Sequence, residues 1–433
     1  MTSTSPAAPV ARPSAGLFTR LCVMMLLQFI VFGSWFATLG LVLATNGLGE
    51  IVGVAYSFAA LGAIFSPMLL GAIADRFVAS QRVLGAIHAI GGILLLFMPG
   101  LVGSGDGGVL LTLIFVYMLF FIPSLGLTNS IAFRHLKGND RLFPYIRVFG
   151  TLGWIVAGLG VGWSGLSAST GVFIVAAVAS FALAVYAFTL PHTPPVGGGP
   201  RFSIGDLVGA KSWVLFRQRN FVVFGICALL TTVCLSTYNA YASAFLGALG
   251  IENVAGVLTI GQISEVVFIV TIPFVLTWLG MKWALLGGMV MWGIRFVLFA
   301  VAAGNEVPWL AIFGIALHGI CNDFFLILGA MYVDQVAGPA LKAQAQSYFL
   351  FVSTGLGAFL GSLVAGQVYN AVVAPSVAAG ENDLSAWATL WILPIAASVL
   401  AAIVWIAFFR MNEHKATEQA VLAEIAAAQE QAG

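Results

Sequence analysis

Apolar segments of roughly 20 residues or more follow one another along almost the whole chain, and a helix of that length crosses the hydrocarbon core of a bilayer. A soluble domain carries about 25% charged residues, whereas this chain is 8% charged and 61% hydrophobic. A membrane β-barrel would need alternating segments of about 10 residues, and the sequence does not show that alternation. The pattern therefore predicts an all-α membrane protein.

Twelve apolar segments predict twelve transmembrane helices. They cover 17–45, 50–74, 80–101, 107–135, 143–164, 169–190, 219–248, 253–280, 282–302, 307–333, 342–371 and 385–409. The first of them exceeds the roughly 7–15 apolar residues of a secretory signal and has no small-residue cleavage site, so we expect it to be retained as a helix.

Positive charge alternates between the predicted loops and sets the orientation. Lys and Arg occupy one set of loops and both ends of the chain: Arg12, Arg20, Arg76, Arg82, Arg134, Lys137, Arg141, Arg201, Lys211, Arg217, Arg219, Lys282, Lys342, Arg410 and Lys415. The opposite loops carry only acidic charges: Glu50, Asp106, Glu252, Glu306, Glu381 and Asp383. Basic loops stay in the cytoplasm. We therefore expect a multi-pass protein of the cell (inner) membrane with both termini cytoplasmic.

A Pro- and Gly-rich loop divides the chain nearly in half. We expect residues 1–190 to form an N-terminal six-helix bundle, 191–218 a cytoplasmic linker and 219–410 a C-terminal six-helix bundle, followed by a cytoplasmic tail at 411–433. Two such bundles suggest a transporter whose halves rock about a site near the middle of the membrane.

Several function classes find no support in the sequence. The net charge of +1 offers no basic field for nucleic acid. The four cysteines lie inside apolar segments without the spacing of metal ligands. No zinc-protease motif or ATP-binding loop occurs, so we expect neither an enzyme nor a cofactor, and a monomer in the bilayer. A receptor or an intramembrane enzyme would need a sensing domain or a catalytic set. An exporter or antiporter of drugs or sugars remains an alternative.

Four full charges remain inside the predicted spans: Arg147, Glu265, Arg295 and Asp323. Each would cost about 2.5–3.5 kcal/mol at a helix centre on insertion scales, so each should face a protein interior or a water-filled cavity and find a partner. Such residues are candidates for function.

Two of these charges have polar neighbours on the same stretch of helix. Gln262 precedes Glu265 by three residues, so both project from one face. Glu265 there forms either a substrate or proton site or a structural ion pair with Arg295. His318 and Asn322 share a face four residues apart, next to Asp323. Asp323 either pairs with Arg295 or acts as a proton-binding or gating carboxylate, and the two roles can coexist because a proton on Asp323 would break the pair.

A third set lies in the fifth predicted span. Arg147, Thr151 and Trp154 follow a four-then-three spacing, which brings a cation, a hydroxyl and an aromatic ring to one face. This set fits a cavity wall, although Arg147 could instead extend to the membrane surface. His88 in the third span is expected to make a hydrogen bond between helices.

Several strings carry a resemblance to known transporters. GAIADR (71–76) resembles the G-x-x-x-D-R loop of the major facilitator superfamily, and the resemblance implies a gating role for Asp75 and Arg76. Nearly the whole chain resembles the nucleoside:proton symporter family. The strings that carry this resemblance are LQFIVFGSWFATLG (27–40), PSLGLTNSIAF (123–133), FPYIRVFGTLGW (143–154), ISEVVFIVTIPF (263–274), IRFVLFA (294–300) and HGICNDFF (318–325).

That resemblance implies the major facilitator fold and proton-driven uptake of nucleosides. It implies a substrate pocket of Arg147, Thr151, Trp154, Asn239, Gln262, Glu265, His318 and Asn322, with proton coupling by Asp323, Glu265 and Arg295. Ser236, His318 and Asn322 depart from well-known members, which carry a glutamine at the first position and can carry aromatic residues at the other two.

The expected chemistry follows from the solute. Amides and a carboxylate can bind ribose hydroxyls, and Trp154, Trp35 or Tyr238 could stack on the base. Burial disfavours a charged carboxylate, so a buried acid takes up a proton more readily than one in water. We expect Glu265 to hold substrate and Asp323 to carry the proton.

Overall fold

The computed structural model describes residues 14–73, 78–136, 139–195 and 204–410. Every regular element in those residues is helical. The α-helices are α1 (Ala15–Gly33), α2 (Leu39–Thr45), α3 (Val52–Ile73), α4 (Ser80–Ser104), α5 (Gly107–Leu136), α6 (Phe143–Trp163), α7 (Gly171–Ala187), α8 (Ile204–Leu207), α9 (Arg219–Ala248), α10 (Val254–Asn305), α11 (Pro308–Ala316), α12 (His318–Asn322), α13 (Leu328–Leu350), α14 (Gly357–Val372), α15 (Ala374–Ala378) and α16 (Leu384–Phe408). Between them lie 3₁₀ segments η1 (Gly49–Ile51), η2 (Asp140–Leu142) and η3 (Ala210–Arg217), and π-helical segments η4 (Asp323–Ile327) and η5 (Phe351–Leu356).

The helices account for the predicted membrane crossings. Within the described residues, eight helical stretches are long and apolar enough to span a bilayer. Two of these, Val254–Asn305 and His318–Val372, are 52 and 55 residues long, and their backbone turns at Gly280 and Gly338, which have φ of 72° and 62°. Two shorter apolar helices, Gly49–Phe65 and Gly171–Ala187, complete the set. The all-helical prediction is confirmed, and the arrangement is consistent with twelve crossings.

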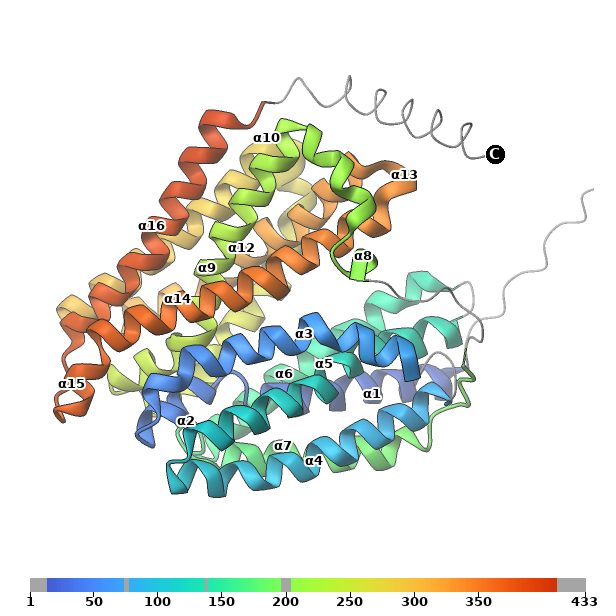
Figure 1. The fold of residues 1–433 in the computed structure, drawn as a ribbon, viewed down its shortest axis with the longest axis horizontal. Coiled ribbons are helices and arrows are strands. Elements are labelled where there is room, and N and C mark those ends of the chain that lie inside the picture. The colour runs from blue at the N-terminus through green and yellow to red at the C-terminus, as the bar shows by residue number, and fades with distance from the viewer. Residues whose placement is uncertain (1–13, 74–77, 137–138, 196–203, 411–433) are drawn as a thin grey trace, which may run out of the picture.

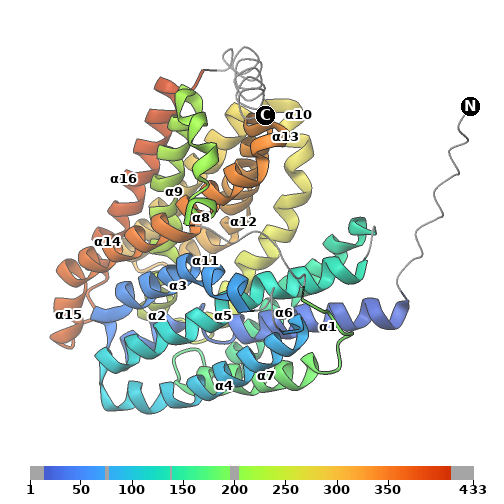
Figure 2. The same cartoon turned by 45° about the vertical axis from the view of Figure 1, so that its right-hand side comes forward.

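The chain gathers into two groups of helices. Figures 1 and 2 show α1 to α7 side by side in one group and α9 to α16 in the other, with α2 and α3 lying against the second group. Contacts between α2 and α9, between α3 and α14, and between α6 and α10 join the groups. We refer to them below as the N-half and the C-half.

The two ends of the bundle differ in charge. We name the end with Arg20, Arg134, Lys282 and Arg410 the basic end, and the end with the acidic residues Glu50, Asp106, Glu252, Glu306 and Glu381 the acidic end. At the basic end, hydrogen bonds form within each half. Arg20 donates to the Thr189 carbonyl at 3.3 Å, and Lys282 donates to the Phe409 carbonyl at 2.9 Å. The predicted gating pair, Asp75 and Arg76, and the tail at 411–433 lie outside the described residues.

Contacts between the halves gather toward the acidic end. Three hydrogen bonds join the halves within the described ranges: Leu41 N to Ser243 Oγ at 3.2 Å, Ala255 N to Ser167 Oγ at 3.1 Å, and Asn370 Nδ2 to the Glu50 carbonyl at 3.0 Å. Glycine allows the backbones to approach closely here. A Cβ placed on Gly53 in α3 would lie 2.5 Å from Cα of Gly366 in α14. The acidic end is therefore closed in this structure.

The first predicted span is broken. Helix α1 ends at Gly33, residues 34–38 form turns, and α2 begins at Leu39. The Ser34 hydroxyl donates to the Ile30 carbonyl at 2.6 Å, so it meets a backbone acceptor where the helix ends. Phe32 at the end of α1 and Phe36 and Ala37 within the break line a cavity together with residues of the C-half.

Candidate functional site

A cavity of about 230 Å³ lies between the two halves. The N-half contributes Phe32, Phe36, Ala37 and Trp154, and the C-half contributes Tyr238, Asn239, Ala242, Ser243, Leu258, Gln262 and His318. Because both halves supply its walls, a relative movement of the halves would change its shape and its access.

Two amide side chains face this cavity without a partner. Asn239 in α9 and Gln262 in α10 line the cavity, and neither side chain hydrogen bonds to another described residue. Each amide offers two N–H donors and a carbonyl acceptor. Both residues are half-buried, so their unpaired donors and acceptors remain accessible from the cavity and are suited to bind a polar solute.

Aromatic rings form the apolar part of the wall of the same cavity. The ring of Phe32 lies edge-on to Trp154 with centroids 5.1 Å apart and packs against Phe36 at 4.4 Å. Tyr238 supplies a further ring from the C-half. Flat apolar faces next to unpaired amides match a solute that has a planar ring and polar edges.

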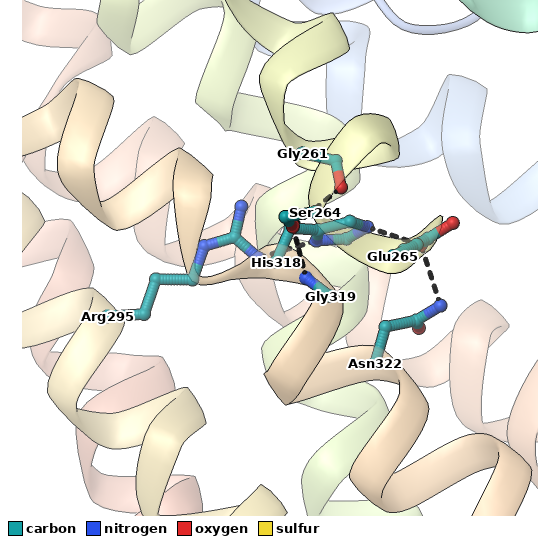
Figure 3. A network of polar contacts seen from close by, with 7 residues as sticks. All are labelled: Gly261, Ser264, Glu265, Arg295, His318, Gly319 and Asn322. Atoms are coloured by element: carbon teal, nitrogen blue, oxygen red, sulfur yellow. Dashed lines mark hydrogen bonds and ion pairs between the residues drawn. The ribbon is translucent and has the colours of Figure 1, made fainter. Parts of the chain in front are cut away.

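A chain of polar contacts runs from the cavity wall into the C-half (Figure 3). Nη1 of Arg295 lies 2.7 Å from Nδ1 of His318, and Nε2 of His318 lies 3.1 Å from Oε1 of Glu265. Asn322 Nδ2 donates to the same glutamate oxygen at 2.8 Å. The proposed Arg295–Glu265 pair is thus bridged by a histidine.

Arg295 is fully buried and is stabilised mainly by rings. Its guanidinium carbon lies 3.6 Å from the Tyr238 ring centroid and 5.3 Å from that of Trp292. Cation–π contacts of this kind are worth about 2 kcal/mol or more when desolvated. Nε and Nη2 of Arg295 have no hydrogen-bond partner among the described residues.

Asp323 does not pair with Arg295. No ion pair joins these two residues in the described part of the chain, and Oδ2 of Asp323, a side chain only 2% exposed, lacks a hydrogen-bond partner there. The structure thus gives no support to the structural Arg–Asp pair. Instead, Asp323 lies within electrostatic range of Glu265.

Arg147 lies to one side of the cavity. Its guanidinium carbon stacks 4.4 Å from the Phe29 ring centroid, and the charge of Glu265 acts on it across the boundary between the halves. Thr151 lies between Arg147 and Trp154 on α6. Of this predicted set, only Trp154 lines the cavity.

Close packing of the helix backbones positions the side chains of His318 and Glu265. A Cβ on Gly319 would come within 2.3 Å of the Ser264 carbonyl, and the Gly319 amide donates to Ser264 Oγ at 2.7 Å. A Cβ on Gly261 would approach Cβ of His318 to 3.1 Å. Only glycine allows α10 and α12 to lie this close, which brings His318 and Glu265 within hydrogen-bonding distance.

The structure thus brings together part of the predicted set. Trp154, Asn239, Gln262 and His318 meet at the cavity, and Glu265 and Asn322 join them through His318 and its neighbours. Trp35 is fully buried against Tyr117 and Phe173, so the suggestion that it stacks on a substrate is wrong for this structure.

Sequence reasoning missed six cavity residues. They are Phe32, Phe36, Ala37, Ala242, Ser243 and Leu258. The available signal was the pair of polar residues Ser34 and Thr38 in the first predicted span, because they mark the helix break beside Phe36.

His88 has the interhelical role expected of it. Its Nε2 lies 2.9 Å from Gln28 Oε1 and its Nδ1 lies 3.0 Å from Ser180 Oγ, deep within the N-half. Gln28 Nε2 donates in turn to Ser124 at 2.7 Å. These contacts tie four helices together away from the cavity.

Comparison with known proteins decides the family. The family model described as nucleoside H+ symporter matches residues 16–414. The chain belongs to this family. It is therefore a proton-coupled nucleoside transporter of the membrane and not an enzyme.

Individual relatives agree over most of their length. The nucleoside permease NupG of Escherichia coli (strain K12) is 32% identical over 412 residues, which cover 90% of this chain and 95% of the permease. The xanthosine permease of the same organism is 29% identical over 410 residues, or 91% and 96% of the two chains. A crystal structure of nucleoside transporter NupG superposes with a TM-score of 0.81 at 30% identity, over 92% of this chain and 100% of that one. The predicted major facilitator fold is confirmed.

Proposed function

We propose that the cavity between the halves is the nucleoside site of this symporter. The observation that carries the proposal is the pair of unpartnered amides, Asn239 and Gln262, facing a cavity walled by Phe32, Trp154 and Tyr238. The base would stack on the rings, and the amides would bind ribose hydroxyls or the base edge. The cavity is smaller than the roughly 300–1,000 Å³ of drug-sized pockets, which suits a compact solute.

We propose that the polar chain beside the cavity couples this site to protons. Glu265 touches the cavity wall through His318, and Asp323 follows Asn322, the second partner of Glu265. The charge of Glu265 acts on Asp323, and two carboxylates that interact in a low-dielectric interior are hard to ionise together. Asp323 would carry the transported proton and Glu265 would bind substrate, with Arg295 linked to Glu265 through His318.

The moving parts are the two bundles. We propose that residues 1–190 and 219–410 move against each other about the cavity, with 191–218 as their linker and 411–433 as a tail. The closed acidic end and the cavity walls supplied by both halves support this division. Arg147 and Thr151 would complete the site when the halves approach at the basic end. Asp75 and Arg76 remain the proposed gating residues.

The distribution of charged residues between the two ends sets the orientation of the protein in the membrane. We propose that the basic end and both termini face the cytoplasm of a cell with an inner membrane, since basic loops are retained inside. The acidic end would then face the outside, where protons are more available. We propose a monomer that carries a nucleoside and protons, with no cofactor.

Uptake in proteoliposomes tests this function. Labelled nucleoside should accumulate when the outside is acidified and should not accumulate without a proton gradient. A competition panel of nucleosides, free bases and sugars should give inhibition only by nucleosides. Inhibition by sugars alone would contradict the proposal. A Glu265→Gln variant should bind nucleoside more weakly, and unchanged uptake would remove Glu265 from the substrate site.

A further inference from the structure

The hydrogen positions along the Arg295–His318–Glu265 chain can be assigned by counting donors. A guanidinium only donates hydrogen bonds, so Nδ1 of His318, 2.7 Å from Nη1 of Arg295, must accept and carries no proton. A neutral imidazole then holds its proton on Nε2, which donates to Oε1 of Glu265 at 3.1 Å. The neighbours of His318 thus select one neutral tautomer.

The surroundings of His318 leave no acceptor for a second proton. The ring is 4% exposed and stacks on Tyr238 with centroids 4.8 Å apart, while Trp292 meets it edge-on at 6.2 Å. The charged or titratable groups around it are Arg295, Glu265, Tyr238 and, on its own stretch of helix, Cys321 and Asp323. A proton on Nδ1 would point at the Arg295 cation.

The two oxygens of Glu265 have different surroundings. Oε1 accepts from His318 and from Asn322, whose Nδ2 lies at 2.8 Å. Oε2 has no hydrogen bond to any described residue, and the side chain is 23% exposed. A carboxylate fixed through one oxygen leaves the other with both lone pairs available for a proton or for a hydroxyl donor.

We propose that His318 is a positioning residue: it remains neutral and holds Glu265 by Oε1, so that Oε2 is where the carboxylate meets a proton or a ribose hydroxyl. This inference rests on the proposed function. It explains how the fully buried Arg295 cation can act on the Glu265 carboxylate without contacting it. It also means that protonation at Oε2 leaves both hydrogen bonds to Oε1 intact.

Two substitutions separate a neutral bridge from a proton carrier. His318→Gln keeps an N–H donor and a carbonyl acceptor but cannot titrate, whereas His318→Phe removes both groups. The matched control is His192→Gln, a histidine exposed outside the spans, beside Gln81.

Our proposal predicts that His318→Gln raises KM for nucleoside less than His318→Phe does, while accumulation stays proton-driven and its pH dependence keeps the wild-type midpoint. His318→Phe should raise KM for nucleoside about tenfold or more, because a hydrogen bond to a charged group is lost. His192→Gln should behave as wild type. Loss of accumulation in His318→Gln, with nucleoside exchange retained, would overturn the proposal and make His318 the proton carrier.

A second measurement does not depend on the transported solute. Nitrogen-15 NMR of the full chain in nanodiscs, with His318 assigned by its loss in His318→Gln, should show Nε2 protonated and Nδ1 unprotonated between about pH 5 and 8. A doubly protonated ring or a proton on Nδ1 in that range would refute the inference. If wild-type protein fails to take up nucleosides, the proposed function fails while this assignment of His318 can still hold.

Discussion

Replacing Gly53 with alanine places one methyl group at the closest crossing between the halves. The added Cβ would lie 2.5 Å from Gly366 Cα, 2.7 Å from the Ser362 carbonyl and 3.0 Å from the Gly366 amide nitrogen. All three obstacles are backbone atoms, so no side chain can rotate away. The clash exists only while α3 and α14 touch, and it therefore acts on the closed acidic end alone.

The free-energy cost of this clash can be estimated from the packing of the two helices. Inserting a methyl group into a well-packed contact costs about 1–3 kcal/mol. This corresponds to a decrease of roughly 5- to 150-fold in the ratio of closed to open acidic ends. Alanine also raises helix propensity by about 1 kcal/mol relative to glycine, and a control variant must carry the same gain.

Gly160→Ala provides that control. Gly160 lies in α6, and a Cβ there would meet nothing within 4 Å. Spin labels on cysteines placed at Asp106 and Asn305, which are exposed on the N-half and the C-half at the acidic end, would report the separation of the halves. The four native cysteines are buried and should label poorly.

We expect Gly53→Ala to shift the distance distribution toward longer separations, with Gly160→Ala unchanged from the parent. Identical distributions in the two variants would refute the reasoning, because the crossing would then not limit opening. A fall in expression of both variants alike would indicate a general effect of alanine in these helices.

The proposed site makes three further predictions. Gln262→Met should weaken nucleoside binding about 5- to 150-fold, since a substrate group would lose its partner at about 1–3 kcal/mol, as measured by equilibrium binding. Asp323→Asn should abolish accumulation driven by a pH step but retain exchange of internal for external nucleoside, and intact accumulation would exclude Asp323 as the proton carrier. Trp154→Ala should weaken binding of nucleosides through lost stacking, worth about 1–3 kcal/mol per base, and unchanged affinity would place the base elsewhere.

Part of the site could be predicted from the sequence because charge is costly in lipid. Arg147, Glu265, Arg295 and Asp323 stood out from the apolar runs for that reason. Their partners could not be predicted in the same way. Arg295 was expected against a carboxylate, yet it contacts His318 and the Tyr238 ring.

Helical spacing also has a limited range. From Asp323 to Ile327 the chain forms a π-helical segment, whose wider turn shifts the faces that follow it. The break after Gly33 likewise places Phe36 outside the helices, where it lines the cavity. At such a position the sequence does not distinguish an apolar residue that faces lipid from one that faces the core or a solute.

The membrane-protein class, the alternation of basic and acidic loops and the short set of costly polar residues could be predicted from the sequence, because transfer of each residue between water and lipid depends on its own chemistry. Which of those residues meet could be learned only from the packed helices. Contacts such as Gly319 against Ser264 and Gly53 against Gly366 depend on how two distant helices approach, and that approach is set by the packing of the whole chain.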